Sequence, residues 1–295
     1  MNKQTHVVLL GAGAIGVLAA AELAKCPAVK LSVAASGERL ERYRKEGIFL
    51  NGEKLPLNFV SPEELSAADL VIVATKMTSL REALECVVPA VSEKTVFLPV
   101  LNGISASGVI QERFPGSTVL KGFHLGHASV RTGNKISFDG VGAFYCGGEK
   151  SALDFAAGVL RTAGVEVETP DNFEIPMWQK FVLNVGINQT QGFFKADYGT
   201  VQKDPKMLRF AWDLMEEAVA VGRAAGVQLG DEVIDSAMMV ICKMPADVKT
   251  SMLQDVEAGR ETEVEAFAGT VCRLAEKFGI DVPNNKLVLE KIKGL

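Results

Sequence analysis

Three polar side chains recur at helical spacing within an otherwise apolar stretch of the chain. Lys180, Asn184 and Asn188 stand four residues apart, a step that places side chains on one face of an α-helix. Most of their neighbours from 178 to 188 are apolar, which predicts a largely buried helix. Polar groups in such a place must be paired or must serve a ligand. We interpret this face as a ligand site with Lys180 as its proton donor. The alternative is a polar face that the opposite domain satisfies.

A second set of polar residues lies further along the chain. Ser251 and Gln254 have the spacing of a capping box at a helix start, so Ser251 is either a cap or a ligand contact. Glu263 and Glu265 are either solvated helix charges or acids of the same site. Periodicity does not distinguish these alternatives.

Histidine offers no proton donor in the second half of the chain. His6, His124 and His127 all lie in the first half. His6 precedes a predicted strand, where a structural role is expected, and the pair His124 and His127 is placed to approach a ligand cleft. Two histidines without a third ligand at suitable spacing do not make a metal site, so no metal is expected.

The N-terminal residues have the pattern of a phosphate-binding turn. Gly11-Ala12-Gly13-Ala14-Ile15-Gly16 follows the apolar run 7–10 and opens a helical pattern. Gly11 permits the tight turn, Gly13 lets the backbone approach a pyrophosphate, and Gly16 allows close packing of helix on strand. Free N–H groups at the start of the helix attract phosphates. The motif with these flanks predicts a dinucleotide site and an oxidoreductase that uses a nicotinamide cofactor.

The residues after the second predicted strand bear on the choice between NAD and NADP. An NAD site usually has a carboxylate there for the ribose 2′-hydroxyl. This chain has Ala34-Ala35-Ser36-Gly37 instead, followed by Glu38 and Arg39. Ser36 and Arg39 are expected to bind a 2′-phosphate, which favours NADP. Glu38 keeps NAD open as the alternative.

The elements that must position these residues divide the chain in two. The first half alternates short apolar runs with helical patterns, which indicates a parallel sheet covered by helices on both faces. We expect strands at 7–10, 31–35, 70–74 and 95–101, helices at 15–25 and 39–46, and antiparallel strands between 123 and 146 at the sheet edge. From 175 onwards the period is helical. The prediction is an α/β fold: a Rossmann-type dinucleotide-binding domain over 1–171 and an all-α substrate and catalytic domain over 172–295.

Composition narrows the class of protein and its partners. The 295 residues carry a net charge of -5, which disfavours nucleic acid as a partner. The five cysteines are scattered and form no C-x-x-C pair, as expected of reduced thiols in a cytoplasmic protein. Apart from the N-terminal uncharged run 7–21, which contains the glycine motif, no run approaches the roughly 20 apolar residues that span a membrane. The expected partner is a small molecule, and a homodimer through the helical domain stays open.

Taken together, these segments resemble the ketopantoate reductase (2-dehydropantoate 2-reductase) family over essentially the whole chain. The resemblance rests on the glycine motif at 11–16, Thr75-Lys76, Leu101-Asn102-Gly103, residues 178–188, TSMLQDV at 250–256, Thr262-Glu263 and GIDVPN at 279–284. The family reduces 2-dehydropantoate to pantoate, an intermediate of pantothenate and coenzyme A synthesis. The resemblance therefore implies this activity, with NADPH as the cofactor.

The resemblance also implies roles for residues of the helical half. Lys180 matches the general acid that protonates the C2 carbonyl oxygen, and Glu263 matches the acid that orients this lysine and contacts cofactor or substrate. Asn184 and Asn188 would hold the hydroxyl end of the substrate, and Ser251 its carboxylate.

Two further positions follow predicted strands of the first half. Lys76 and Asn102 would contact the nicotinamide, its ribose and the substrate, because α/β sheets bind ligands at the carboxyl ends of their strands. The implied cofactor set is Gly11, Ala12, Gly13, Ala14, Ile15, Gly16, Ser36, Arg39, Lys76, Asn102 and Glu263.

Two departures from the family pattern bear on the cofactor and the substrate. Ser36 stands where the family often has an arginine for the 2′-phosphate. Gln189-Thr190-Gln191-Gly192 replaces the Pro-Leu-Thr-Ala-like segment that commonly follows the second asparagine. Two alternatives stay open: a reductase of another branched 2-oxo acid, and a binding protein that senses NADP without turnover.

Overall fold

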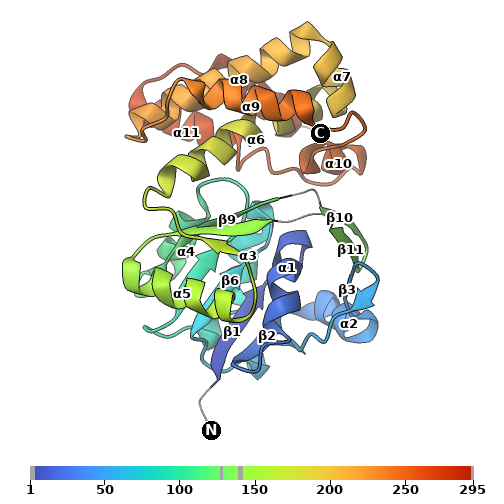
Figure 1. The fold of residues 1–295 in the computed structure, drawn as a ribbon, viewed down its shortest axis with the longest axis vertical. Coiled ribbons are helices and arrows are strands. Elements are labelled where there is room, and N and C mark those ends of the chain that lie inside the picture. The colour runs from blue at the N-terminus through green and yellow to red at the C-terminus, as the bar shows by residue number, and fades with distance from the viewer. Residues whose placement is uncertain (1–3, 127–128, 139–141, 294–295) are drawn as a thin grey trace. The chain divides into compact units, whose positions relative to one another are not determined.

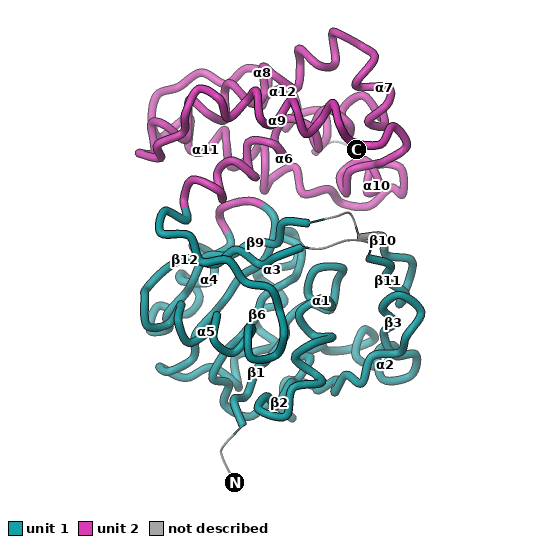
Figure 2. Tube along the Cα trace, viewed as in Figure 1, with its two compact units in different colours: residues 1–102, 106–173 teal, residues 103–105, 174–295 magenta. Residues whose placement is uncertain are grey.

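The chain forms two compact units in a computed structural model that describes residues 4–126, 129–138 and 142–293. The first unit comprises residues 1–102 and 106–173, and the second comprises residues 103–105 and 174–295 (Figure 2).

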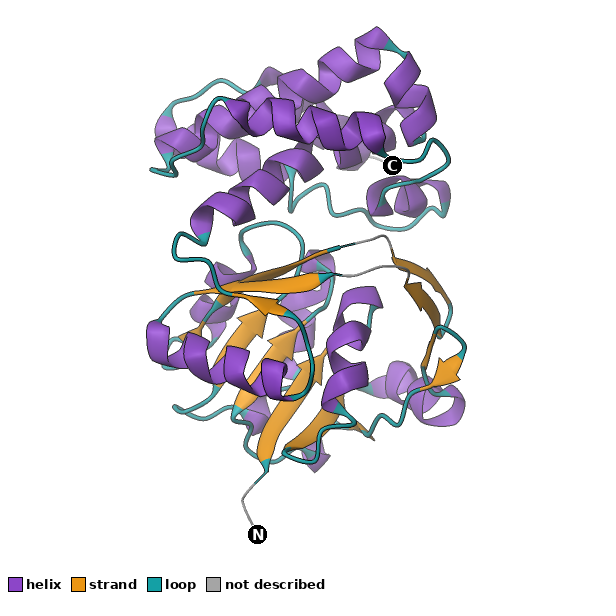
Figure 3. Ribbon diagram, viewed as in Figure 1, coloured by secondary structure: helices purple, strands orange, loops and turns teal. Residues whose placement is uncertain are grey.

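The first unit is built on a six-stranded sheet with the order β5-β2-β1-β6-β7-β8. Figures 1 and 3 show its strands with helices around them. Its strands are β1 (Thr5–Leu10), β2 (Val29–Ala34), β5 (Phe59–Val60), β6 (Leu70–Val73), β7 (Val96–Pro99) and β8 (Thr118–Val119). Every neighbouring pair in this sheet is parallel. The predicted parallel sheet is therefore confirmed.

Helices cover both faces of this sheet, which explains why β6, β7 and residues 7–10 of β1 are apolar. Val7 and Leu9 of β1 belong to one core cluster with residues of α1 (Ala14–Leu23) and α5 (Lys150–Thr162). Val8 and Leu10 belong to another, with residues of α3 (Leu80–Glu85) and α4 (Ala106–Arg113). Successive strand residues point to opposite faces, so a strand buried on both sides is apolar throughout.

The remaining helical segments of this unit are short. They are α2 (Gly37–Glu46) and the 3-10 turns η1 (Pro62–Glu64), η2 (Met77–Ser79) and η3 (Val88–Ala90).

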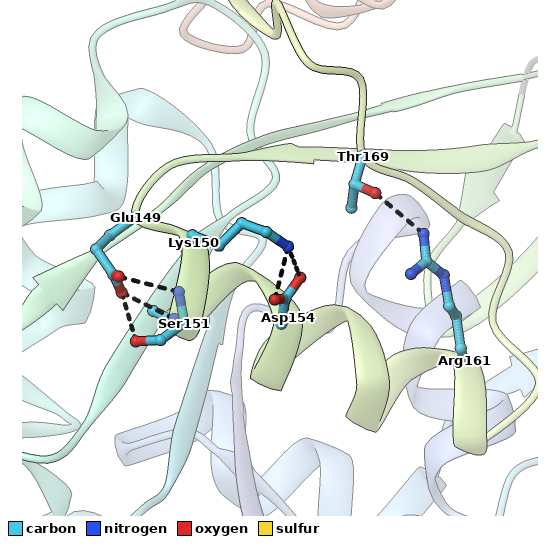
Figure 4. A network of polar contacts seen from close by, with 7 residues as sticks. Glu149, Lys150, Ser151, Asp154, Arg161 and Thr169 are labelled. Atoms are coloured by element: carbon cyan, nitrogen blue, oxygen red, sulfur yellow. Dashed lines mark hydrogen bonds and ion pairs between the residues drawn. The ribbon is translucent and has the colours of Figure 1, made fainter.

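Local polar contacts fix α5 at both ends (Figure 4). The Glu149 carboxylate accepts hydrogen bonds from the backbone N–H groups of Ser151 and Ala152, so it caps the helix. At the other end, Arg161 donates to the carbonyl oxygen of Val167 at 2.8 Å and to Thr169 Oγ1 at 3.3 Å. These bonds hold the helix against the strand that follows it, β13 (Val167–Glu168).

Two small sheets complete the unit, and they correct the prediction for residues 123–146. One has the order β10-β11-β3-β4 and the other β13-β12-β9, so these strands do not extend the edge of the parallel sheet. The strands are β3 (Phe49–Leu50), β4 (Glu53–Lys54), β9 (Lys121–Leu125), β10 (Ser129–Thr132), β11 (Lys135–Phe138) and β12 (Ala143–Gly147). The pairs β10–β11 and β9–β12 are antiparallel as expected, but β11 pairs in parallel with the distant β3.

Between residues 174 and 293, all the regular structure of the second unit is helical, as predicted. Its helices are α6 (Glu174–Phe194), α7 (Tyr198–Lys203), α8 (Pro205–Ala224), α9 (Glu232–Lys243), α10 (Ser251–Glu257), α11 (Ala268–Phe278) and α12 (Pro283–Lys293). Across residues 4–126, 129–138 and 142–293, no helix is long and apolar enough to cross a membrane.

Helix α6 is the centre of this unit. It packs against α8, α9, α10 and α12. Close approach to α8 needs a glycine, because a Cβ on Gly186 would lie 2.7 Å from Cγ of Met215. This packing fixes the rotation of α6 and therefore the direction of its polar side chains.

Candidate active site

The glycine motif forms a turn that no other residue type fits at its first position. Gly11 has a φ of +100°, and a Cβ there would lie 2.7 Å from backbone atoms of Ala74 and Thr75. A Cβ on Gly16 would lie 2.2 Å from the carbonyl oxygen of Gly11. The roles expected for these two glycines in turn and helix packing are therefore visible in the geometry.

The turn leaves the start of α1 open to an anion. Gly13 is the N-cap residue of α1, no side chain caps the helix, and its first turn contains no acidic residue. Ala14 and Ile15 begin the helix. Uncapped N–H groups at the positive end of a helix dipole bind phosphate groups.

A cavity of about 430 Å³ adjoins the turn and is lined entirely by the first unit. Gly11 and Ala12 contribute to it from the turn, and Ser36, Arg39 and Tyr43 contribute from the tip of β2 and from α2. Ser36 and Arg39 thus line the same cavity. Ser36 Oγ is 3.4 Å from Sγ of Cys86, which also lines the cavity.

Thr75 gives a direct sign that this cavity takes a polar ligand. Its Oγ1 is buried without a hydrogen-bond partner in the described part of the chain, and the residue lines the cavity. A buried hydroxyl without a partner is costly unless a ligand or water satisfies it. Together with the cradle at Gly11, it fits the adenosine and pyrophosphate part of a dinucleotide.

Lys76 and Asn102 lie just beyond the carboxyl ends of adjacent parallel strands. Lys76 follows β6 and precedes η2, with an exposed side chain. Asn102 follows β7 and is half-buried. This edge of an open α/β sheet is where ligands bind.

In the second unit, α6 carries Lys180, Asn184 and Asn188 as predicted. Lys180 and Asn184 are half-buried and Asn188 is 7 % exposed. Neither asparagine side chain has a hydrogen-bond partner among the described residues of its own unit. The donors and acceptors of both amides are therefore available to a ligand.

Lys180 has a perturbed pKa. Burial lowers the pKa of its ammonium group to about 8, and the opposite charge of Glu263 works against this effect. Glu263 is itself 7 % exposed and lies in the turn before α11. A buried acid beside a half-buried lysine is typical of a site that handles protons.

Glu265 has a different environment from Glu263, so the structure distinguishes the two acids although the sequence pattern does not. Its carboxylate accepts hydrogen bonds from Lys293 at 2.7 Å and from Arg273 at 3.2 Å, and its side chain is 45 % exposed. These ion pairs lower the pKa of Glu265 and assign it a surface role.

The capping-box interpretation of Ser251 is wrong. Thr250 is the N-cap of α10, and its side chain accepts from the N–H of Leu253. The amide of Gln254 instead donates to the carbonyl oxygen of Lys249. Ser251 is the first residue of the helix and is exposed, so its hydroxyl is not used as the cap.

Sequence reasoning missed the function of Gln191. Its Oε1 accepts the backbone N–H of Thr250 at 2.8 Å, while its Nε2 is buried without a partner in the described residues. Gln191 therefore ties α6 to the start of α10, where Ser251 lies. Its spacing of three residues from Asn188 on the same helix is the signal that places it on the same face.

The histidines contribute to the core of the first unit. His6 is buried and contacts the carbonyl oxygen of Ala67 and Oγ of Ser32, which agrees with a structural role. His124 is buried on β9 with its ring edge-on to Phe144. His127 lies outside the described residues.

The fold and the two sets of residues define a class. A Rossmann-like unit with a glycine turn and a helical unit with a half-buried lysine of lowered pKa are typical of a nicotinamide dinucleotide-dependent reductase. Two family models match the chain: ketopantoate reductase PanE/ApbA over residues 7–149, and ketopantoate reductase PanE/ApbA C terminal over residues 172–295. The chain belongs to the ketopantoate reductase family.

Individual relatives cover almost the whole chain. The 2-dehydropantoate 2-reductase of Archaeoglobus fulgidus is 28% identical over 297 residues, which is 98% of this chain and 97% of that protein. The crystal structure of a PanE/ApbA family ketopantoate reductase from Ralstonia eutropha has a TM-score of 0.88 at 25% identity, covering 98% of this chain and 97% of that one. D-mandelate dehydrogenase, solved with NADH and anilino(oxo)acetate, shares the fold with a TM-score of 0.88 at 21% identity, covering 98% of both chains.

Proposed function

We propose that this protein reduces 2-dehydropantoate to pantoate with NADPH, in pantothenate and coenzyme A synthesis. The observation that carries the proposal is Lys180, a half-buried lysine with a pKa of about 8 beside the buried Glu263. This pair occurs in a chain of the ketopantoate reductase family whose relatives, 25–28% identical over nearly their full length, carry the name of this activity.

Lys180 is the general acid of the proposed reaction. When bound, the reduced nicotinamide supplies a hydride to C2 of the substrate. The ammonium group of Lys180 donates a proton to the C2 oxygen, and solvent then reprotonates the amine. With a pKa of about 8, Lys180 is mostly protonated at neutral pH and is a better donor than an exposed lysine. Glu263 keeps that charge stable despite burial.

The remaining polar residues position the substrate. We assign the hydroxyl end of 2-dehydropantoate to the amides of Asn184 and Asn188, and its carboxylate to Ser251. Asn102 and Lys76, at the carboxyl ends of β7 and β6, are assigned to the substrate, the nicotinamide and its ribose. Unpartnered amides on α6 and the exposed hydroxyl of Ser251 support these roles.

NADPH is favoured over NADH by the residues at the tip of β2. Ala34, Ala35 and Ser36 line the cavity without an acid among them, and Arg39 lines it from α2. At the tip of β2 a 2′-phosphate would therefore meet a hydroxyl and a guanidinium group, where an NAD site would offer a carboxylate. The acids that line the same cavity, Glu82 and Glu85, come from α3, and Glu85 is paired with Arg113. Comparison of kcat/KM for NADPH and NADH tests this choice, and better use of NADH would contradict it.

A reductase of another 2-oxo acid is the second candidate. The polar residues 189–191 favour it, because they replace a Pro-Leu-Thr-Ala-like segment that is common in the family. Steady-state rates with 2-dehydropantoate and a panel of branched and aromatic 2-oxo acids separate the two. A clear preference for another acid would reject 2-dehydropantoate and leave the roles of Lys180 and Glu263 intact.

We place the reaction in the cytoplasm, where the five free cysteines would remain reduced.

We also propose a homodimer through the helical unit, since Met239 and Val240 on α9 are 55% and 44% exposed. A monomeric mass by light scattering at working enzyme concentration would contradict the dimer.

A further inference from the structure

Arg131 in the β10–β11 hairpin has an unusual environment. Its Nη1 donates to the carbonyl oxygen of Ala12 at 3.1 Å, and its Nε donates to the carbonyl oxygen of Gly133 at 2.9 Å. No ion pair found in the described part of the chain includes it. The positive charge of Arg131 is therefore held over the glycine turn without a carboxylate to balance it.

The position of this charge indicates an anionic ligand. Nη1 lies 3.9 Å from the place where a Cβ would stand on Gly13, the N-cap residue of α1. The start of a helix already carries positive partial charge and prefers anions. Arg131 is exposed and adds a full positive charge beside this end of the turn, so an anionic group of the ligand is favoured within its reach.

Other groups at the same place favour the adenosine end of the cofactor. Nη2 of Arg131 lies 3.5 Å from the hydroxyl of Tyr43, and Tyr43 lines the cavity together with Ser36 and Arg39. Tyr43 and Arg39 are one turn apart on α2, so they share a face. Arg39 is exposed, and like Arg131 it takes part in no ion pair found among the described residues.

We propose that Arg131 recognises the 2′-phosphate of NADPH, together with Ser36 and Arg39. The inference rests on the proposed use of NADPH and deepens it. Ser36 leaves the tip of β2 without a cation, and Arg131 supplies one from a hairpin that is far away in the sequence. The free N–H groups of α1 remain for the pyrophosphate, which both cofactors share.

Fragments of the cofactor separate the two phosphate sites. 2′,5′-ADP carries the 2′-phosphate without a pyrophosphate, and ADP carries the pyrophosphate without a 2′-phosphate. Calorimetry gives Kd for both with the wild type and with Arg131→Met, alongside kcat/KM for NADPH and NADH. Lys135→Met is the matched control, because Lys135 is an exposed cation of the same hairpin, opposite Thr132.

Arg131→Met is expected to weaken 2′,5′-ADP binding and to lower kcat/KM for NADPH by roughly tenfold or more, the size of a hydrogen bond to a charged group. ADP binding and NADH use should change by less than about twofold, as should every quantity in Lys135→Met. Arg131→Lys, which keeps the charge and loses the planar fork, should fall between wild type and Arg131→Met. Unchanged thermal unfolding shows that the variants are folded.

The other results overturn the inference in distinguishable ways. Equal losses for ADP and 2′,5′-ADP would place Arg131 at the pyrophosphate. Tight 2′,5′-ADP binding by both wild type and Arg131→Met would support NADPH as the cofactor but limit Arg131 to a structural contact between the hairpin and the glycine turn. Weak 2′,5′-ADP binding by the wild type would reject NADPH itself, and the role of Arg131 with it.

Discussion

Glu263→Gln is expected to move the pH dependence of reduction to lower pH. The charge of Glu263 raises the pKa of Lys180 against the effect of burial, and the balance lies at about 8. Without the carboxylate, burial acts alone and the Lys180 pKa falls. Only the ammonium form donates a proton, so kcat/KM is level below this pKa and declines about tenfold per pH unit above it.

The size of the change follows from the two pKa values. An opposite charge close by changes a pKa by about 1 to 3 units, so about 1 unit is the smallest shift expected. If the Lys180 pKa falls from about 8 to about 7, the ammonium fraction at pH 8.5 falls from about a quarter to about 3%, which is close to eightfold. At pH 6 the same change lowers the fraction by only about a tenth.

The assay is kcat/KM for the 2-oxo acid at saturating NADPH, measured from below pH 6 to above pH 9. Glu265→Gln is the control, because Glu265 is two residues away but is paired with Lys293 and Arg273 at the surface. We expect its alkaline decline to coincide with that of the wild type. A decline in Glu263→Gln at the wild-type pH would refute the coupling to Lys180. A loss of the same size at every pH would assign Glu263 to binding alone.

Two further variants probe the same unit. Lys180→Ala should lower turnover by at least ~100-fold, the lower range for lost acid catalysis, while NADPH binding measured by calorimetry is kept. Unchanged turnover would remove Lys180 from the mechanism. NADPH binding without any turnover in the wild type would favour the NADP sensor. Gln191→Met removes the acceptor of the Thr250 N–H, so the start of α10 should become less ordered. We expect KM for the 2-oxo acid to rise several-fold, roughly the effect of one lost hydrogen bond, with kcat nearly constant. A fall in kcat at constant KM would contradict this positioning role.

The parts of the fold that short sequence patterns determine were predictable. Residues 7–16 predict the first strand, the turn and the start of α1, because an apolar run followed by spaced glycines restricts the backbone strongly. The four-residue spacing of Lys180, Asn184 and Asn188 likewise predicts a common helix face, and α6 has it. Their roles in binding and catalysis stay predictions, since spacing shows which residues share a face and not which ligand they meet.

The parts that depend on distant pairing were not predictable. Strand β11 pairs with β3 through Lys135 and Phe49, and β3 is only two residues long, which is too short for a periodic pattern to mark it as a strand. The hydrogen bond from Arg131 to the carbonyl oxygen of Ala12 is not predictable for the same reason, because the two residues are 119 positions apart in the sequence. The cap of α10 was misplaced by one residue because Thr250 and Ser251 are both good N-cap residues, and the tertiary bond to Gln191 decides between them.

We expect the departure from the family pattern after Asn188 to affect the substrate only indirectly, through contacts within the protein. Gln189 donates to the carbonyl oxygen of Val185 and to Oδ1 of Asn285, and Thr190 donates to the carbonyl oxygen of Gly186, so both are used within the helical unit. Gln191 instead accepts the backbone N–H of Thr250, in the segment that carries Ser251. A change of substrate caused by this segment should therefore affect the carboxylate end, which Ser251 is proposed to hold. The C2 carbonyl, which depends on Lys180, should be unaffected, so an altered substrate preference and an intact proton donor are compatible in this chain.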